Sequence, residues 1–168
     1  MIRARWFTSP VLLVAGTLAA GTPPAAPHRL DFWLGDWEVF SRAGPKDGDN
    51  RLEKLLDGYV IQENWTELDG HEGKSWFYYH PGERHWKQVW VTDGGALKEK
   101  NEADDAPAGS VRFQGEAFTA DGRRIADRTT LTPLPDGRVR QVIEQSRDGG
   151  RTWQTVYDAV YVHRTKKD

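Results

Sequence analysis

The run Arg138-Val139-Arg140-Gln141-Val142-Ile143-Glu144-Gln145-Ser146 is followed by the turn Arg147-Asp148-Gly149-Gly150-Arg151 and then by Thr152-Trp153-Gln154-Thr155-Val156-Tyr157-Asp158-Ala159-Val160-Tyr161-Val162. Both outer runs are rich in β-branched and aromatic residues, which favour strands. The Asp-Gly pair between them tolerates the positive φ of a hairpin turn. In the second run Trp153, Thr155, Tyr157, Ala159 and Tyr161 alternate, so we expect them to share one face. This segment predicts an antiparallel β-hairpin.

The same pattern extends over most of the chain. Asp-Gly pairs occur at 47–48, 57–58, 69–70, 93–94, 121–122, 136–137 and 148–149. Strands are expected near 37–42, 51–56, 59–68, 74–80, 85–92, 96–101, 110–118, 124–131, 138–146 and 152–162. About ten strands joined by short turns predict an all-β fold, and closure into an up-and-down antiparallel β-barrel would hide the sheet edges. A flat two-sheet sandwich is the alternative. Because no repeat of fixed period occurs, residues 27–168 are predicted to form one domain.

Residues 1–26 have the layout of a signal peptide and leader. Arg3 and Arg5 precede the apolar run 11–20, and small residues and prolines follow from 21 to 27. The run is shorter than the roughly 20 apolar residues of a membrane-spanning helix. The layout predicts a periplasmic or secreted protein with no membrane span after processing, cleaved after Ala20 or later, near Ala26. A hydrophobic N-terminus on a cytoplasmic protein is the alternative.

Composition excludes several classes of function. The net charge is −2, and removal of residues 1–20, which contain Arg3 and Arg5 but no acid, would make it −4. With both signs interspersed, the chain has no basic footprint for nucleic acid. The absence of cysteine excludes disulfides and thiolate metal sites. Eight tryptophans supply large apolar area for a core or an aromatic-lined cavity.

The sequence Gly35-Asp36-Trp37 resembles the Gly-x-Trp opening of lipocalin-like barrels, in which the tryptophan closes the base of the barrel. Four wider stretches are similar to a group of exported bacterial proteins of unknown function: 31–37, 51–58 followed by 62–65, 86–91 and 135–141. The resemblance runs from about Leu30 to Tyr161. It implies a lipocalin-like, calycin-type barrel and export, but no mechanism.

Two further motifs bear on cofactors and turns. Some related barrels, the nitrobindin-like ones, hold haem through a histidine near the C-terminus, and His163 is the candidate for that role here. The segment Ser146–Trp153 also matches the Asp-box pattern of β-propellers. Since the motif occurs once and turn chemistry explains it, we interpret it as a structural hairpin in which Asp148 caps turn amides.

Metal and catalytic constellations are sparse. His80 and His85 flank a Pro-Gly turn and are expected near each other, but a closed zinc site needs about four ligands, so exposed turn histidines are the favoured interpretation and no metal is predicted. Glu63 and Glu144 are strand carboxylates that would suit an acid and base pair, although most such residues face solvent.

Polar residues within apolar strands give the clearest indication of function. If their faces point inward, they would form an aromatic cavity with a few fixed polar groups, the usual composition of a small-molecule site. The candidate lumen residues are Glu63, Trp65, Trp86, Gln88, Trp90, Arg128, Gln141, Tyr157 and Tyr161. Arg128 or Gln88 would fix the polar end of a ligand. A solid core filled by the tryptophans is the alternative, because a shift of one residue inverts the two faces.

The leading hypothesis is therefore a non-catalytic module that binds a small hydrophobic or amphipathic ligand. An enzyme that uses the same cavity, with Glu63 or a histidine as general base, is the second hypothesis. A partner-binding protein of the cell envelope is the third.

Overall fold

A computed structural model of the chain describes residues 28–165. Its elements are η1 (Asp31–Trp33), β1 (Gly35–Ser41), β2 (Lys46–Leu55), η2 (Leu56–Gly58), β3 (Val60–Glu67), β4 (Glu72–His80), β5 (His85–Thr92), β6 (Leu97–Ala103), β7 (Val111–Phe118), β8 (Arg124–Pro133), β9 (Val139–Ser146) and β10 (Gln154–His163). The signal-peptide prediction falls on residues outside this range. No helix within the range is long and apolar enough to cross a membrane.

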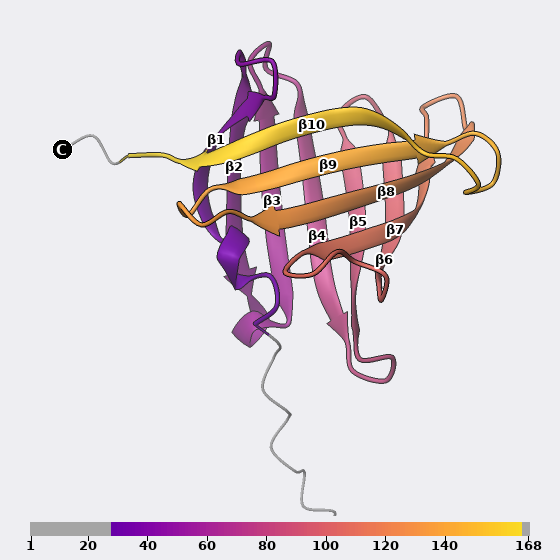
Figure 1. Ribbon diagram of the computed structural model, residues 1–168, viewed down its shortest axis with the longest axis horizontal. Coiled ribbons are helices and arrows are strands. Elements are labelled where there is room, and N and C mark those ends of the chain that lie inside the picture. The colour runs from indigo at the N-terminus through magenta and orange to yellow at the C-terminus, as the bar shows by residue number, and fades with distance from the viewer. Residues whose placement is uncertain (1–27, 166–168) are drawn as a thin grey trace, which may run out of the picture.

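The ten strands form one closed antiparallel barrel (Figure 1). Each strand pairs with its neighbour in sequence, and β10 pairs with β1 to close the sheet, with Val39 opposite Tyr161. Closure leaves no unpaired sheet edge. The predicted all-β, up-and-down barrel is confirmed, and the flat sandwich is wrong.

The predicted strands match those of the barrel, with one clear exception at Asp47-Gly48. These residues lie inside β2, and the turn comes earlier, at 42–45. The position needs glycine for space, because a Cβ at Gly48 would lie 2.8 Å from the Trp65 ring and 2.2 Å from the Thr66 carbonyl oxygen. In this pair the glycine allows a close approach between strands.

Alternate residues of each strand face the interior, as the pattern in β4 illustrates. Gly73, Ser75 and Phe77 are buried, whereas Trp76 is exposed on the outside. In β10 a bulge between Thr155 and Tyr157 adds one residue to the strand. The extra residue reverses the alternation, so the prediction that Trp153 and Thr155 share a face with Tyr157 is wrong.

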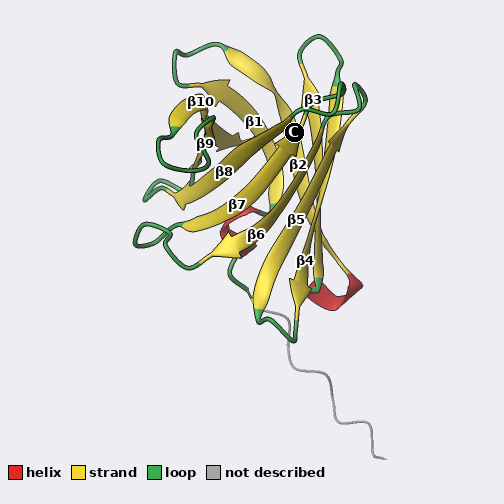
Figure 2. Cartoon of the chain, turned by 90° about the vertical axis from the view of Figure 1, so that its right-hand side faces the viewer, coloured by secondary structure: helices red, strands yellow, loops and turns green. Residues whose placement is uncertain are grey.

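One end of the barrel, at which β1 begins, is packed with aromatic side chains, and we call it the closed end. Trp33 of η1 contacts Phe77 and Tyr161 edge to face, with ring centroids 5.6 and 5.7 Å apart. Trp37 is fully buried, and its indole N–H donates to the Trp33 carbonyl oxygen at 3.0 Å. The two helical turns, red in Figure 2, both lie at this end. Trp37 thus closes the base of the barrel, as the Gly-x-Trp resemblance implies.

Candidate ligand-binding cavity

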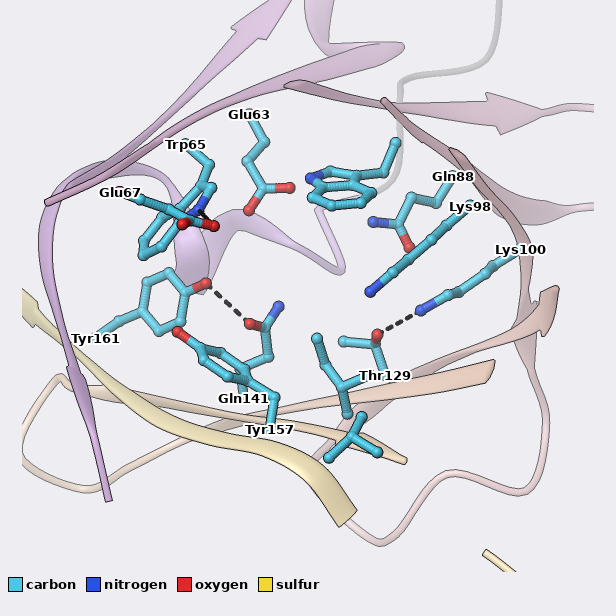
Figure 3. A pocket seen from close by; sticks show the side chains of 13 residues that line it. Glu63, Trp65, Glu67, Gln88, Lys98, Lys100, Thr129, Gln141, Tyr157 and Tyr161 are labelled. Atoms are coloured by element: carbon cyan, nitrogen blue, oxygen red, sulfur yellow. Dashed lines mark hydrogen bonds between the residues drawn. The ribbon is translucent and has the colours of Figure 1, made fainter. Parts of the chain in front are cut away.

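The other end of the barrel, which we call the open end, contains a cavity of about 250 Å³ (Figure 3). Seven of the predicted lumen residues line it: Glu63, Trp65, Gln88, Trp90, Gln141, Tyr157 and Tyr161. Six further residues complete the lining: Glu67, Lys98, Lys100, Thr129, Ile143 and Val156. The lining side chains come from β3, β5, β6, β8, β9 and β10.

Trp65 of β3 and Trp90 of β5 form the aromatic wall of the cavity, with β4 between the two strands. Two glycines make room for them. Gly48 lies under the Trp65 ring, and a Cβ at Gly73 would lie 2.9 Å from the Trp90 indole nitrogen. Both glycines are buried. Trp65 pairs with Asn50, and Gly48 lies two residues nearer the rim on the same strand. Trp90 pairs with Ser75, and Gly73 likewise lies two residues nearer the rim. The two indoles therefore lean toward the open end.

The floor of the cavity is a chain of buried polar side chains centred on Glu63. Asn50 Nδ2 donates to Glu63 Oε1 at 2.7 Å, and Ser75 also hydrogen-bonds Glu63. Gln88 Nε2 donates to Ser75 Oγ at 3.3 Å. Burial raises the pKa of the Glu63 carboxyl above its usual range, although these hydrogen bonds oppose the effect.

A second part of the floor links β9 and β10. The Tyr161 hydroxyl donates to Gln141 Oε1 at 3.0 Å and lies 3.4 Å from Asn50 Nδ2. Burial and the nearby Glu63 raise the pKa of Tyr161 well above its ordinary value. Tyr157, nearer the rim, is affected in the same direction by burial and by the Asp47 carboxylate, which raise its pKa. Both phenols are therefore neutral hydrogen-bonding groups at physiological pH.

The β6 wall carries two lysines that point into the cavity from alternate positions. Lys100 is fully buried, pairs with the buried Asp127, and donates to Thr129 Oγ1 at 2.6 Å. Burial and the neighbouring Lys98 lower the pKa of Lys100 to about 8. Lys98 Nζ lies 3.9 Å from Asp127 Oδ2 and 4.8 Å from the centre of the Trp90 ring. One carboxylate thus faces two ammonium groups.

Two of the predicted lumen residues do not line the cavity. Trp86 faces inward but belongs to the closed-end core, where it is 1% exposed and packs edge to face on Tyr79. Arg128 lies on the outside, where it forms a two-pronged ion pair with Glu144 at 2.8 and 3.0 Å and covers the Trp153 ring. The prediction that Arg128 faces the lumen is wrong, because its neighbour Asp127 takes the inward position. Glu144 is likewise outside, so it shares no site with Glu63.

The histidines singled out in the sequence lie away from the cavity. His163 stacks on Trp37 at the closed end, with ring centroids 3.7 Å apart, so it is not placed to ligate a group bound at the open end. His80 and His85 pair across the β4–β5 hairpin, where His85 contacts Asp104 at 3.0 Å and His80 accepts from the Glu83 amide. Between residues 28 and 165, no three histidine or acidic residues cluster as a metal site would require.

The Asp-box segment forms the turn that its sequence predicts. Asp148 accepts hydrogen bonds from the amides of Arg151 and Thr152 at 3.0 and 2.9 Å and from the Thr152 hydroxyl at 2.7 Å. These bonds lower the pKa of Asp148 to about 2. The turn joins β9 to β10 at the rim of the open end.

Comparison with known proteins does not identify this chain: no family model matches it, and no curated protein is significantly similar.

Proposed function

We propose that the barrel binds a small amphipathic ligand in the open-end cavity. The apolar part of the ligand would lie against Trp65 and Trp90, and its polar end would reach the floor around Gln88. The observation that carries this proposal is the combination of an aromatic wall with a buried polar floor in one solvent-accessible cavity. Such a combination is typical of small-molecule sites.

The floor has hydrogen-bonding capacity that its own residues do not use. Gln88 Oε1 and Asn50 Oδ1 are buried, and neither has a partner among the described residues. A buried acceptor without a partner costs about 1–3 kcal/mol. Gln88 is 8% exposed and lines the cavity, so a donor at its oxygen, either on the ligand or on a water molecule that bridges to the ligand, would relieve that cost.

The size of the cavity limits the ligand. About 250 Å³ lies just below the ~300–1,000 Å³ typical of sites for drug-sized molecules. The ligand is therefore expected to be a single ring with a short chain, or an alkyl chain of similar volume. Transfer of its apolar surface out of water would contribute about 25 cal/mol per Å².

A neutral probe tests binding without assuming a charge on the ligand. Isothermal titration calorimetry of residues 27–168 with 4-phenylbutanol should give one site, with Kd of about 1 mM or tighter for a molecule of this size. Ile143→Trp would fill the cavity from the β9 wall and should abolish binding. Val142→Trp places the same side chain on the outer face of the same strand and should leave binding unchanged.

The two variants separate cavity binding from adsorption to the barrel surface. Circular dichroism and thermal melting of both would establish that each keeps the barrel fold. If 4-phenylbutanol shows no saturable binding, or if both tryptophan variants bind it equally, the proposed cavity site is wrong.

We also propose that the protein is exported to the periplasm or secreted, as a member of the exported group it resembles. The support is the arginine, apolar and small-residue layout of residues 1–26. Expression of the full chain in a Gram-negative host, with mass spectrometry of the periplasmic and cytoplasmic fractions, tests it. A periplasmic product that begins at residue 21 or 27 is expected, whereas an uncleaved cytoplasmic product would contradict export.

A further inference from the structure

The two lysines of the cavity are unequally paired with Asp127, and Lys98 is the one that does not contact it directly. Asp127 is the ion-pair partner of both Lys98 and Lys100 within residues 28–165. Lys100 Nζ is in direct contact with the carboxylate, whereas Lys98 Nζ is 3.9 Å away, beyond hydrogen-bonding distance. Lys100 therefore neutralises Asp127. Among the described residues no carboxylate lies within hydrogen-bonding distance of the Lys98 ammonium group, and only the longer-range charges of Asp127 and Glu63 act on it.

Lys98 is also largely removed from water. Its side chain is 17% exposed, and its ammonium group lies over the face of the Trp90 ring. A cation–π contact attracts an ammonium group but provides no hydrogen-bond acceptor for its three N–H donors. In Figure 3 the Lys98 side chain projects into the middle of the cavity beside Gln88 and Lys100.

The acidic residues of the lining are less well placed to bind a cation than Lys98 is to bind an anion. Glu63 is 5% exposed and already accepts hydrogen bonds from Asn50 and Ser75. Burial also raises the pKa of Glu63, which favours its neutral form. Glu67 is exposed at the rim, where the Trp65 indole N–H donates to it at 3.5 Å.

We infer that the ligand of this cavity is a small organic carboxylate, whose anionic group pairs with Lys98 and whose apolar part packs on Trp90 and Trp65. This inference rests on the proposed function, because it assigns the chemical class of the ligand for the same site. Lys98 lies directly against the aromatic wall, so one ligand reaches both without a long chain. A charge-assisted hydrogen bond in a poorly solvated site is among the stronger polar contacts.

Three probes that share one apolar part test the charge preference: 4-phenylbutyrate, 4-phenylbutanol and 4-phenylbutylamine. At pH 7 the carboxylate should bind at least about tenfold more tightly than the alcohol, as expected for a hydrogen bond to a charged group. The amine should bind more weakly than the alcohol, because Lys98 would repel it.

Variants of two lysines assign that preference to one residue. Lys98→Met should reduce the affinity for 4-phenylbutyrate to that for 4-phenylbutanol, and Lys98→Arg should retain the preference for the carboxylate. Lys87→Met is the matched control: Lys87 is on the outer face of β5, paired with Glu83 at 2.8 Å, and its loss changes the net charge equally. That control should leave all three affinities unchanged.

The outcomes separate this inference from the proposed function. If the alcohol binds and the carboxylate binds no better, the carboxylate assignment is wrong and the cavity site stands. The same conclusion follows if Lys98→Met and Lys87→Met weaken the binding of 4-phenylbutyrate equally. Preference for the amine would also overturn the assignment and would point to Glu63 or Glu67. If none of the probes binds, the proposed function fails, and the assignment fails with it.

Discussion

The closed and open ends of the barrel share the same ten strands but have interiors of opposite character. At the closed end, Trp33, Trp37 and Phe113 are buried, and aromatic rings meet edge to face at centroid distances of 5.2–6.2 Å. At the open end the side chains that surround the cavity of about 250 Å³ are polar or half-buried. One end of the interior is filled, and the other is hollow.

Single strands cross from one kind of interior to the other without any change in alternation. Along the inner face of β5, Trp86 is core, Gln88 is floor and Trp90 is wall. Along β10, Tyr161 lies at the floor and Tyr157 near the rim. Stability and ligand binding are therefore expected to depend on different halves of the same strands, and substitutions of matched residues in the two halves test this separation.

The largest contrast is expected between two tryptophans. Trp37→Ala removes a fully buried side chain at the closed end and should lower the free energy of unfolding by about 3–5 kcal/mol. Trp65→Ala removes a half-buried side chain beside the cavity and should cost about 1 kcal/mol, while weakening the binding of 4-phenylbutanol. Urea unfolding measures both costs, and equal values would contradict the separation of a stabilising closed end from a ligand-binding open end.

The next largest effect on stability is expected at the buried ion pair between Lys100 and Asp127 in the wall of the cavity. Lys100→Met leaves Asp127 buried without its close partner and should cost about 3 kcal/mol in urea unfolding. Lys100→Met combined with Asp127→Leu removes both charges and should recover most of that loss. If the double variant is as unstable as the single one, lost packing and not the unpaired charge determines the cost.

The pH dependence of stability should distinguish Glu63 of the floor. Burial raises its pKa in the folded protein, so the native state holds the proton at pH values where the unfolded chain has lost it. This group therefore makes the protein less stable as pH rises from its ordinary pKa of 4.5 toward the folded pKa. The loss amounts to about 1.4 kcal/mol for each pH unit that separates the folded from the unfolded pKa.

Glu63→Gln removes that dependence. The stability of Glu63→Gln relative to the natural chain should increase between about pH 4 and pH 7, as measured by urea unfolding across that range. Glu53→Gln, in β2, is the control, since that side chain is partly exposed and pairs with Arg51 at 3.0 Å. A relative stability that is constant with pH would show that the floor does not hold the Glu63 proton.

The smallest effect is expected at the rim, in the turn between β9 and β10. Asp148→Ala should lower the melting temperature modestly at pH 7 and leave ligand binding unchanged, because the turn bonds lie outside the cavity. The folded pKa of about 2 lies below the ordinary 3.8, so the stabilisation is present above about pH 4 and is lost as pH falls toward 2. Arg147→Ala, which removes no side-chain hydrogen bond of the described turn, should have no such pH-dependent effect.

The sequence predicted the strands and their closure because turn chemistry and alternation are local properties. It did not predict the turn before β2, because Asp47-Gly48 has a turn signature and its glycine serves a contact with Trp65 that is distant in sequence. Seven cavity residues were predicted from strand alternation, which places polar residues and aromatic residues on shared faces.

The two missed lysines and the misplaced Arg128 share one cause. In residues 97–101 the charged run Lys98, Glu99 and Lys100 is typical of a solvent-exposed strand. The two lysines nevertheless face the interior, because Asp127 on β8 pairs with them there. In residues 125–129 both Asp127 and Arg128 are charged, so the sequence does not show which of them faces inward. Arg128 faces outward because its partners, Glu144 and Trp153, lie on the outer surface of the barrel. Such partners lie on other strands, and one sequence does not show which charges they neutralise.

The indole N–H signals of the seven tryptophans in residues 28–165 report on both ends of the barrel and on its outer surface at once. A ¹⁵N-labelled sample titrated with 4-phenylbutyrate should show shifts at Trp65 and Trp90 of the cavity wall. Trp33, Trp37 and Trp86 at the closed end should remain unchanged, as should Trp76 and Trp153 on the outside. Shifts confined to Trp76 and Trp153, or spread equally over all seven signals, would contradict a ligand site in the open half of the barrel.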